Sequence, residues 1–100
     1  MSDERPELTL GYIPYSLEAE QAVLGAVLYD NSAFDRCGDL LAEKDFFTSR
    51  HRTIWNALAQ LINACKPADL FTVHERVRAL SPQDDHGGVA YLSQLSYSVP

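Results

Sequence analysis

The sequence predicts an all-α domain, organised as a compact orthogonal bundle of about five short helices. Three observations lead to this prediction. Apolar residues recur at helical spacing in several separate stretches, and no stretch has the pattern of a strand. Residues that can cap a helix precede these stretches, and proline or polar turns divide them. The length of 100 residues fits one domain that can bury a core.

The first helix is expected from about Leu17 to Tyr29. Ser16 can accept a hydrogen bond from an unpaired amide at the helix start. Glu18 and Glu20 lie in the first turn, where the positive end of the helix dipole favours acidic side chains. The second half of this stretch contains no charge, so we expect the helix to be buried on most sides.

Residues 1–13 are expected to form a flexible tail, and residues 14–100 the helical domain. The tail is polar and acidic, contains the helix breakers Pro6 and Gly11, and has no periodicity. It lacks the basic start and apolar segment of a signal peptide, and no run in the chain reaches the ~18 apolar residues of a membrane span. These features predict a cytoplasmic protein.

A second helix, from about Ala33 to Leu41, is expected after a turn in which Ser32 can act as the cap. The connection that follows contains Phe46 and Phe47. Both side chains are too large to leave in solvent, so we expect at least one of them to enter the core from the loop.

The third and longest helix is expected from about Arg50 to Cys65, with Ser49 as its cap and Pro67 as its stop. Its apolar stripe has the clearest helical spacing in the chain: Ile54, Leu58, Leu61, Ile62 and Cys65, with Trp55 beside it. Cys37 and Cys65 both fall in expected helices, so we interpret them as unpaired, small core residues.

Two shorter helices complete the bundle. The fourth is expected from Val73 to Leu80, with Thr72 as its cap, and Ser81-Pro82 ends it. The fifth begins near Val89, after a polar loop, and carries apolar residues at helical spacing.

The charge distribution argues against a nucleic-acid surface as the main function. The net charge is −6, whereas nucleic-acid binding needs a basic face. Five basic residues lie between positions 50 and 80, and the simplest interpretation is a solvated, mixed surface. A small DNA-binding module that uses Arg50, His51 and Arg52 at a helix start remains the alternative. His51 is otherwise expected at the exposed or capping end of that turn, with the arginines paired to Asp45 or Glu43.

The sequence contains no pattern of a catalytic or cofactor site. The glycine pair Gly87-Gly88 is not followed by the lysine of a phosphate-binding loop, so we expect neither nucleotide binding nor ATP hydrolysis by this chain. The three histidines are far apart and no metal-ligand spacing occurs. A small hydrolase is a further alternative, but no nucleophile has a histidine base near it in the sequence.

Four short segments, in a fixed order, resemble the N-terminal domain of DnaB-type replicative DNA helicases. Residues 16–28 read SLEAEQAVLGAVL, like the opening helix of that family. Three further matches follow along the chain: Asp45-Phe46-Phe47 with His51-Arg52 and Ile54, then residues 67–73, then residues 87–92 with Leu95. The family usually ends its third helix in glycine, where this chain has Cys65-Lys66.

The resemblance implies assembly and recruitment rather than catalysis. Such domains pair, and the pairs form a collar that supports a hexameric motor and docks primase and a loader or accessory replication protein. ATP and Mg²⁺ would then belong to the full-length parent, and this chain would lack the parent's helical hairpin and ATPase motor. The chain would need no cofactor or metal of its own and would bind little or no DNA.

Residues of the last helix are the candidates for a protein interface. Val89 and Tyr97 are the stronger ones, because an apolar helix start gains from burial against another chain and tyrosine is enriched at contacts. Tyr91 and Leu92 are also candidates, although burial statistics favour the core for both.

Overall fold

The computed structural model describes residues 16–38, 40–84 and 86–97, and the prediction for residues 1–13 lies outside them. The described residues form helices and contain no strand, which confirms the all-α prediction. The elements in chain order are α2 (Leu17–Tyr29), the 3₁₀ turn η1 (Asn31–Ala33), α3 (Phe34–Cys37), the 3₁₀ turn η2 (Glu43–Asp45), α4 (Ser49–Asn63), α5 (Leu70–Leu80) and α6 (Gly88–Ser96).

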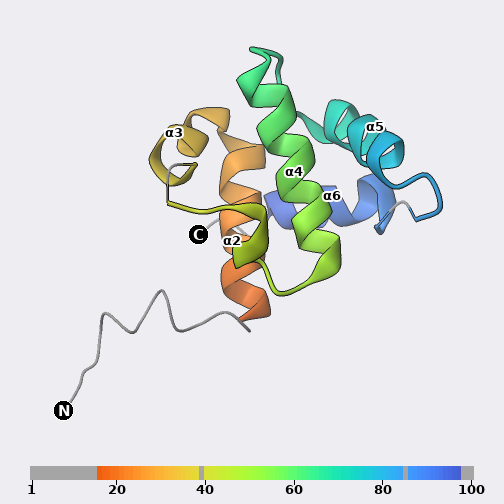
Figure 1. Cartoon of the computed structure of the whole chain (residues 1–100), viewed down its shortest axis with the longest axis horizontal. Helices are drawn as coiled ribbons and strands as arrows, with labels where there is room; N and C mark the ends of the chain where they lie inside the picture. Colours follow the sequence, from red (N-terminus) through yellow and green to blue (C-terminus); the bar gives the residue numbers. More distant parts are fainter. Residues whose placement is uncertain (1–15, 39, 85, 98–100) are drawn as a thin grey trace.

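Helix α4 is the central element of the bundle. It packs against α2 on one side and α5 on the other, and α6 packs against both of these flanking helices. In Figure 1, α6 passes behind α4 and runs across its direction, as the orthogonal arrangement predicts. The core is the buried set contributed mainly by these four helices: Leu24, Val27, Ile54, Leu58, Leu61, Val73, Val77, Leu92 and Leu95.

Helix α2 begins and ends where the sequence predicts. The Ser16 hydroxyl accepts a hydrogen bond from the amide of Ala19 at 3.1 Å, so it caps the helix as expected. Leu24 and Val27 are fully buried on its inner face.

The predicted second helix is much shorter in the structure. Asp30, rather than Ser32, caps this region, because its carboxylate accepts hydrogen bonds from the amide and hydroxyl of Ser32 at 3.0 and 2.7 Å. Those bonds hold the pKa of Asp30 below its usual value. The local bonds produce η1 first, and α3 then ends at Cys37, followed by Gly38, a poor helix former.

Phe46 enters the core and Phe47 does not, which confirms the expectation for this pair. Phe46 is 3% exposed and lies 5.3 Å from the Trp55 ring, centroid to centroid, whereas Phe47 is 58% exposed. Phe34 lies on the same indole at 5.2 Å, so Trp55 joins α3 and the loop before α4 to the core.

Helix α4 ends at Asn63, two residues earlier than predicted. Cys65 has a φ of +60°, and the amides of Cys65 and Lys66 donate to the carbonyls of Ile62 and Leu61, each at 2.9 Å. This is a Schellman ending with cysteine at the position that usually holds glycine. Cys65 is therefore exposed, and the prediction that it is a core residue is wrong.

Helix α5 begins at Leu70, three residues before the prediction, because Asp69 is the cap. The Asp69 carboxylate accepts from the amides of Phe71 and Thr72 at 2.9 Å, and the Thr72 hydroxyl accepts from the Asp69 amide at 2.8 Å. Thr72 is thus the partner in a reciprocal capping box rather than the cap itself.

No helix among the described residues is both long enough and apolar enough to cross a membrane.

Candidate functional site

Three polar side chains from three different helices meet inside the bundle. Glu20 of α2, His51 of α4 and Tyr91 of α6 form what we call the Glu–His–Tyr network. His51 Nδ1 lies 2.7 Å from Glu20 Oε1, and His51 Nε2 lies 2.6 Å from the Tyr91 hydroxyl. His51 has no exposed surface and Glu20 is 7% exposed, so the network is part of the interior.

The surrounding hydrogen bonds define the role of each group. Glu20 also accepts bonds from the backbone amides of residues 47 and 48, at 2.6 and 3.4 Å, so it acts as an acceptor toward His51 Nδ1–H as well. The Gln21 amide donates to the Tyr91 oxygen at 3.3 Å, and the Tyr91 hydroxyl also shares a hydrogen bond with His51 Nε2. Each ring nitrogen of His51 therefore has a partner, and the network joins three helices.

Two glycines bring Tyr91 into this position. Gly87 and Gly88 have φ values of +92° and +66°, a region that glycine enters without steric cost. A Cβ at Gly87 would lie 2.6 Å from the Cβ of Tyr91, so only glycine fits this close approach. The glycine pair thus shapes the start of α6.

The expectation that His51 lies at an exposed helix end is wrong. His51 precedes Ile54 and Trp55 by one helical turn, so it lies on the same side of α4 as the buried stripe. This spacing in the sequence indicates that His51 is buried. Glu20 precedes the buried Leu24 by one turn in the same way. The sequence predicts only a favourable position for Glu20 in the helix dipole, and the pairing of Glu20 with His51 appears only in the structure.

The two arginines beside His51 do not pair with acidic residues of the preceding turn. The Arg50 guanidinium carbon lies 4.4 Å from the centroid of the Tyr91 ring, a cation–π contact. Arg52 donates to the carbonyls of Phe46 and Phe47 at 2.9 and 2.8 Å. Asp45, one of the expected partners, instead accepts from the amide of Ala42 at 2.7 Å.

The four interface candidates on and beside α6 have different environments. Leu92 is 3% exposed and belongs to the core, and Tyr91 is half-buried in the network. Val89 is half-buried at the helix start. Tyr97 is 84% exposed and is the only one of the four whose ring lies largely in solvent. An interface role for these residues stays a prediction.

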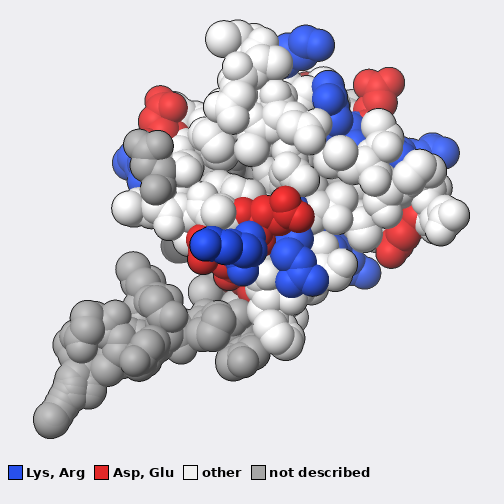
Figure 2. Space-filling model, viewed as in Figure 1, with Lys and Arg blue, Asp and Glu red and all other residues white. Residues whose placement is uncertain are grey.

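The described surface also presents other large apolar side chains and a mixture of charges. Residues from several elements are substantially exposed: Leu17, Tyr29, Leu40, Phe47, Phe71 and Leu80. On the face drawn in Figure 2, basic and acidic side chains lie close to one another, and no large area carries one sign. No cluster of His, Cys, Asp or Glu that could hold a metal ion occurs among the residues that the structure describes.

Comparison with known proteins gives consistent similarities in sequence and in fold. The family described as the DnaB-like helicase N-terminal domain matches residues 12–100. The chain is 40% identical over 87 residues to the replicative DNA helicases DnaB of Pasteurella multocida and Geobacillus stearothermophilus. Each alignment covers 87% of this chain and 19% of the relative, so the chain spans about a fifth of the length of these curated relatives.

A solved structure shares the fold. The crystal structure of the N-terminal domain of DnaB helicase from Mycobacterium tuberculosis superposes with a TM-score of 0.81 and 32% sequence identity. The match covers 87% of this chain and 60% of that chain.

Proposed function

Because the chain belongs to the family of DnaB-like helicase N-terminal domains, we propose that it is a non-catalytic assembly and recruitment domain of a replicative DNA helicase. In this proposal the domain pairs with other copies to build a collar that supports a hexameric ring, and it docks primase and a loader or accessory protein. ATP, Mg²⁺ and DNA translocation belong to the full-length parent.

The main support for a non-catalytic role is the burial of the Glu–His–Tyr network, whose groups bond to one another. A general base must lie within hydrogen-bond reach of a substrate proton. His51 has no exposed surface, and its two ring nitrogens contact Glu20 and Tyr91, so no substrate can reach the imidazole in this arrangement. The side chains of Glu20, His51 and Tyr91 therefore join helices, as we expect of a rigid scaffold.

The alternative of a DNA-binding module has less support. Of its three proposed contacts, His51 is buried, Arg52 is bonded to loop carbonyls and Arg50 lies over an aromatic ring. A chain with a net charge of −6 would also repel the phosphate backbone. We expect no salt-dependent affinity for DNA in a fluorescence anisotropy titration.

Sedimentation of the chain across a concentration series tests the assembly role. We expect a dimer that dissociates on dilution and that Tyr97→Asp or Val89→Asp weakens, because either change places a charge at the candidate contact. Tyr29→Asp is the matched control, since Tyr29 is also a largely exposed tyrosine, at 75%, but lies at the end of α2.

Co-sedimentation with the primase and the loader of the same organism tests recruitment. Binding of either protein supports the proposal. If the chain stays monomeric at every concentration, the assembly role of this chain is contradicted. If it also fails to bind primase and the loader, the proposal as a whole is contradicted.

A further inference from the structure

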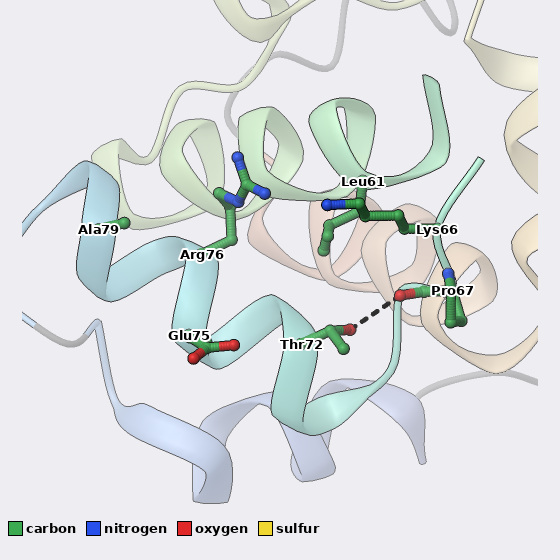
Figure 3. A pocket seen from close by; sticks show the side chains of 7 residues that line it. All are labelled: Leu61, Lys66, Pro67, Thr72, Glu75, Arg76 and Ala79. Carbon is green, nitrogen blue, oxygen red and sulfur yellow. Dashed lines mark hydrogen bonds between the residues drawn. The ribbon is translucent and has the colours of Figure 1, made fainter. Parts of the chain in front are cut away.

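A groove lies between the second half of α4 and the outer side of α5. It contains an open pocket of about 390 Å³, within the usual range of ligand pockets. Figure 3 shows its lining, in which α5 contributes one wall and the α4–α5 connection closes one end. The lining residues are Leu61, Lys66, Pro67, Thr72, Glu75, Arg76 and Ala79.

The end wall of the groove is held in place before any partner arrives. The Schellman bond from the Lys66 amide to Leu61 fixes the turn after α4, and the Thr72 hydroxyl donates to the Pro67 carbonyl at 3.0 Å. The side chain of Asn31, in η1, then ties the connection to α2, because it donates to the carbonyls of Ala68 and Val27 at 3.1 and 2.8 Å and accepts from the Ala68 amide at 2.9 Å. A preformed wall lowers the entropic cost of binding.

The groove has an apolar lining and two cations, neither of which is paired with a carboxylate of the described residues. Leu61, Pro67 and Ala79 supply apolar surface. Arg76 donates to the side-chain oxygen of Gln60 at 3.1 Å, a neutral group that orients the guanidinium without cancelling its charge. Within the described parts of the chain, neither Arg76 nor Lys66 forms an ion pair.

The net charge of the groove is opposite in sign to that of the chain. Lys66 and Arg76 face only one acidic side chain in the lining, Glu75, whereas the chain as a whole carries a charge of −6. Asp69, at the start of α5, keeps its negative charge but does not line the groove. Charge complementarity therefore selects an acidic occupant, and the apolar lining selects one that also carries an apolar side chain.

We propose that this groove binds an acidic, amphipathic segment of a partner protein, with an apolar side chain against Leu61 and Ala79 and carboxylates on Lys66 and Arg76. This inference rests on the recruitment role proposed above and assigns it a surface. Nucleic acid is the less suitable occupant, because Glu75 and the apolar lining would face its phosphates and sugars.

The probe for the test is a synthetic amphipathic peptide with leucines on one face and glutamates beside them. We expect it to shift the NMR signals of the groove residues and to bind more weakly as salt is added. The double variant Lys66→Gln/Arg76→Gln is expected to bind roughly fivefold to tenfold more weakly, from the loss of two surface charge pairs. A matched peptide with glutamines in place of glutamates is expected to bind the wild-type chain more weakly by the same factor.

Arg78→Gln is the control variant, because Arg78 is an exposed arginine of the same helix that does not line the groove. An equal loss of binding in Arg78→Gln would indicate general charge attraction and would overturn the proposal. Absence of peptide binding, signal changes centred elsewhere, or tighter binding of single-stranded DNA in the groove would overturn it as well.

The same variants separate this inference from the recruitment role. If primase or the loader binds the wild-type chain and the double variant equally, recruitment stands and the groove proposal fails. If neither binds the wild-type chain, recruitment fails, and the peptide titration still decides whether the groove takes an acidic segment. A self-association that only the double variant abolishes would assign the groove to a second copy of this chain and overturn the proposal of a different partner.

Discussion

His51 shows how a single residue can be misassigned when its neighbours in the sequence are charged. Two flanking arginines suggest an exposed position, yet the helical phase places His51 on the buried side of α4. The phase was available from the sequence alone. The choice of Glu20 and Tyr91 as partners was not, because these pairs are separated by 31 and 40 residues and depend on how the helices pack.

Replacement of His51 by alanine is expected to destabilise the fold by about 3–5 kcal/mol, because it leaves the buried Glu20 carboxylate without its charged or polar partner and opens a cavity. Tyr91→Phe keeps the ring but leaves the buried Nε2 of His51 without its partner, so it should cost less, about 1–3 kcal/mol. Urea unfolding followed by circular dichroism measures both values. Equal stabilities of the two variants would contradict this account of the network.

Cys65 offers the opposite case, a residue at which substitution should increase stability. Its φ of +60° is costly for any residue with a Cβ, so Cys65→Gly is expected to stabilise the fold by about 1 kcal/mol. Cys65→Ala keeps the Cβ and serves as the control, with no gain expected. The midpoints of thermal unfolding of the two variants provide the comparison, and a gain in both would point to the thiol instead.

At the scale of elements, the sequence predicts a boundary well where one cap is available and poorly where two compete. Helix α2 has Ser16 as its cap and begins as predicted. Before α5 the sequence offers both Asp69 and Thr72, and the reciprocal bonds between them make the earlier residue the cap. The short α3 shows the same effect, because the side chain of Asp30 competes with the expected cap.

The Asp69 cap predicts a measurable dependence of stability on pH. Hydrogen bonds from the amide of Thr72, chiefly, hold the pKa of Asp69 below its usual value in the folded chain. A lowered folded-state pKa contributes stability at pH values above about 4, and that contribution is lost as the pH falls through the folded-state pKa. The free energy of unfolding of wild type should therefore fall more steeply in acid than that of Asp69→Asn.

The comparison of wild type and Asp69→Asn needs a series of urea unfolding curves from neutral pH to below pH 4. Asparagine still caps a helix but has no carboxylate to protonate, so the difference between the two proteins isolates this group. Parallel curves over the whole range would show that the cap does not depend on the charge of Asp69.

At the scale of the whole molecule, the all-α class, the order of the helices and the family were predictable, because each rests on local pattern or on short motifs. The groove between α4 and α5 was not predictable. It depends on the Schellman turn at Cys65, where the sequence lacks the usual glycine, and on the bonds from Asn31 to Ala68 across 37 positions.

Amide hydrogen exchange should distinguish the well-packed central helix α4 from the short helix α3. We expect the slowest exchange in the middle of α4, where Ile54, Ala57 and Leu58 have no exposed surface, and fast exchange in α3, which has no fully buried residue. Mass spectrometry of peptic fragments after exchange makes this measurement. Protection of α3 equal to that of α4 would mean that the two unfold as one cooperative unit.

The start of α4 has a consequence for the order of folding. Thr48 precedes the helix but its side chain forms no capping bond, and the carboxylate that accepts the amides of residues 47 and 48 comes from Glu20 on α2. The segment that leads into α4, and His51 in its first turn, therefore gain their anionic partner only after a loop of nearly thirty residues has closed. We expect the transition state to contain the middle of α4 and to lack this turn, so that Glu20→Gln speeds unfolding with little effect on the folding rate.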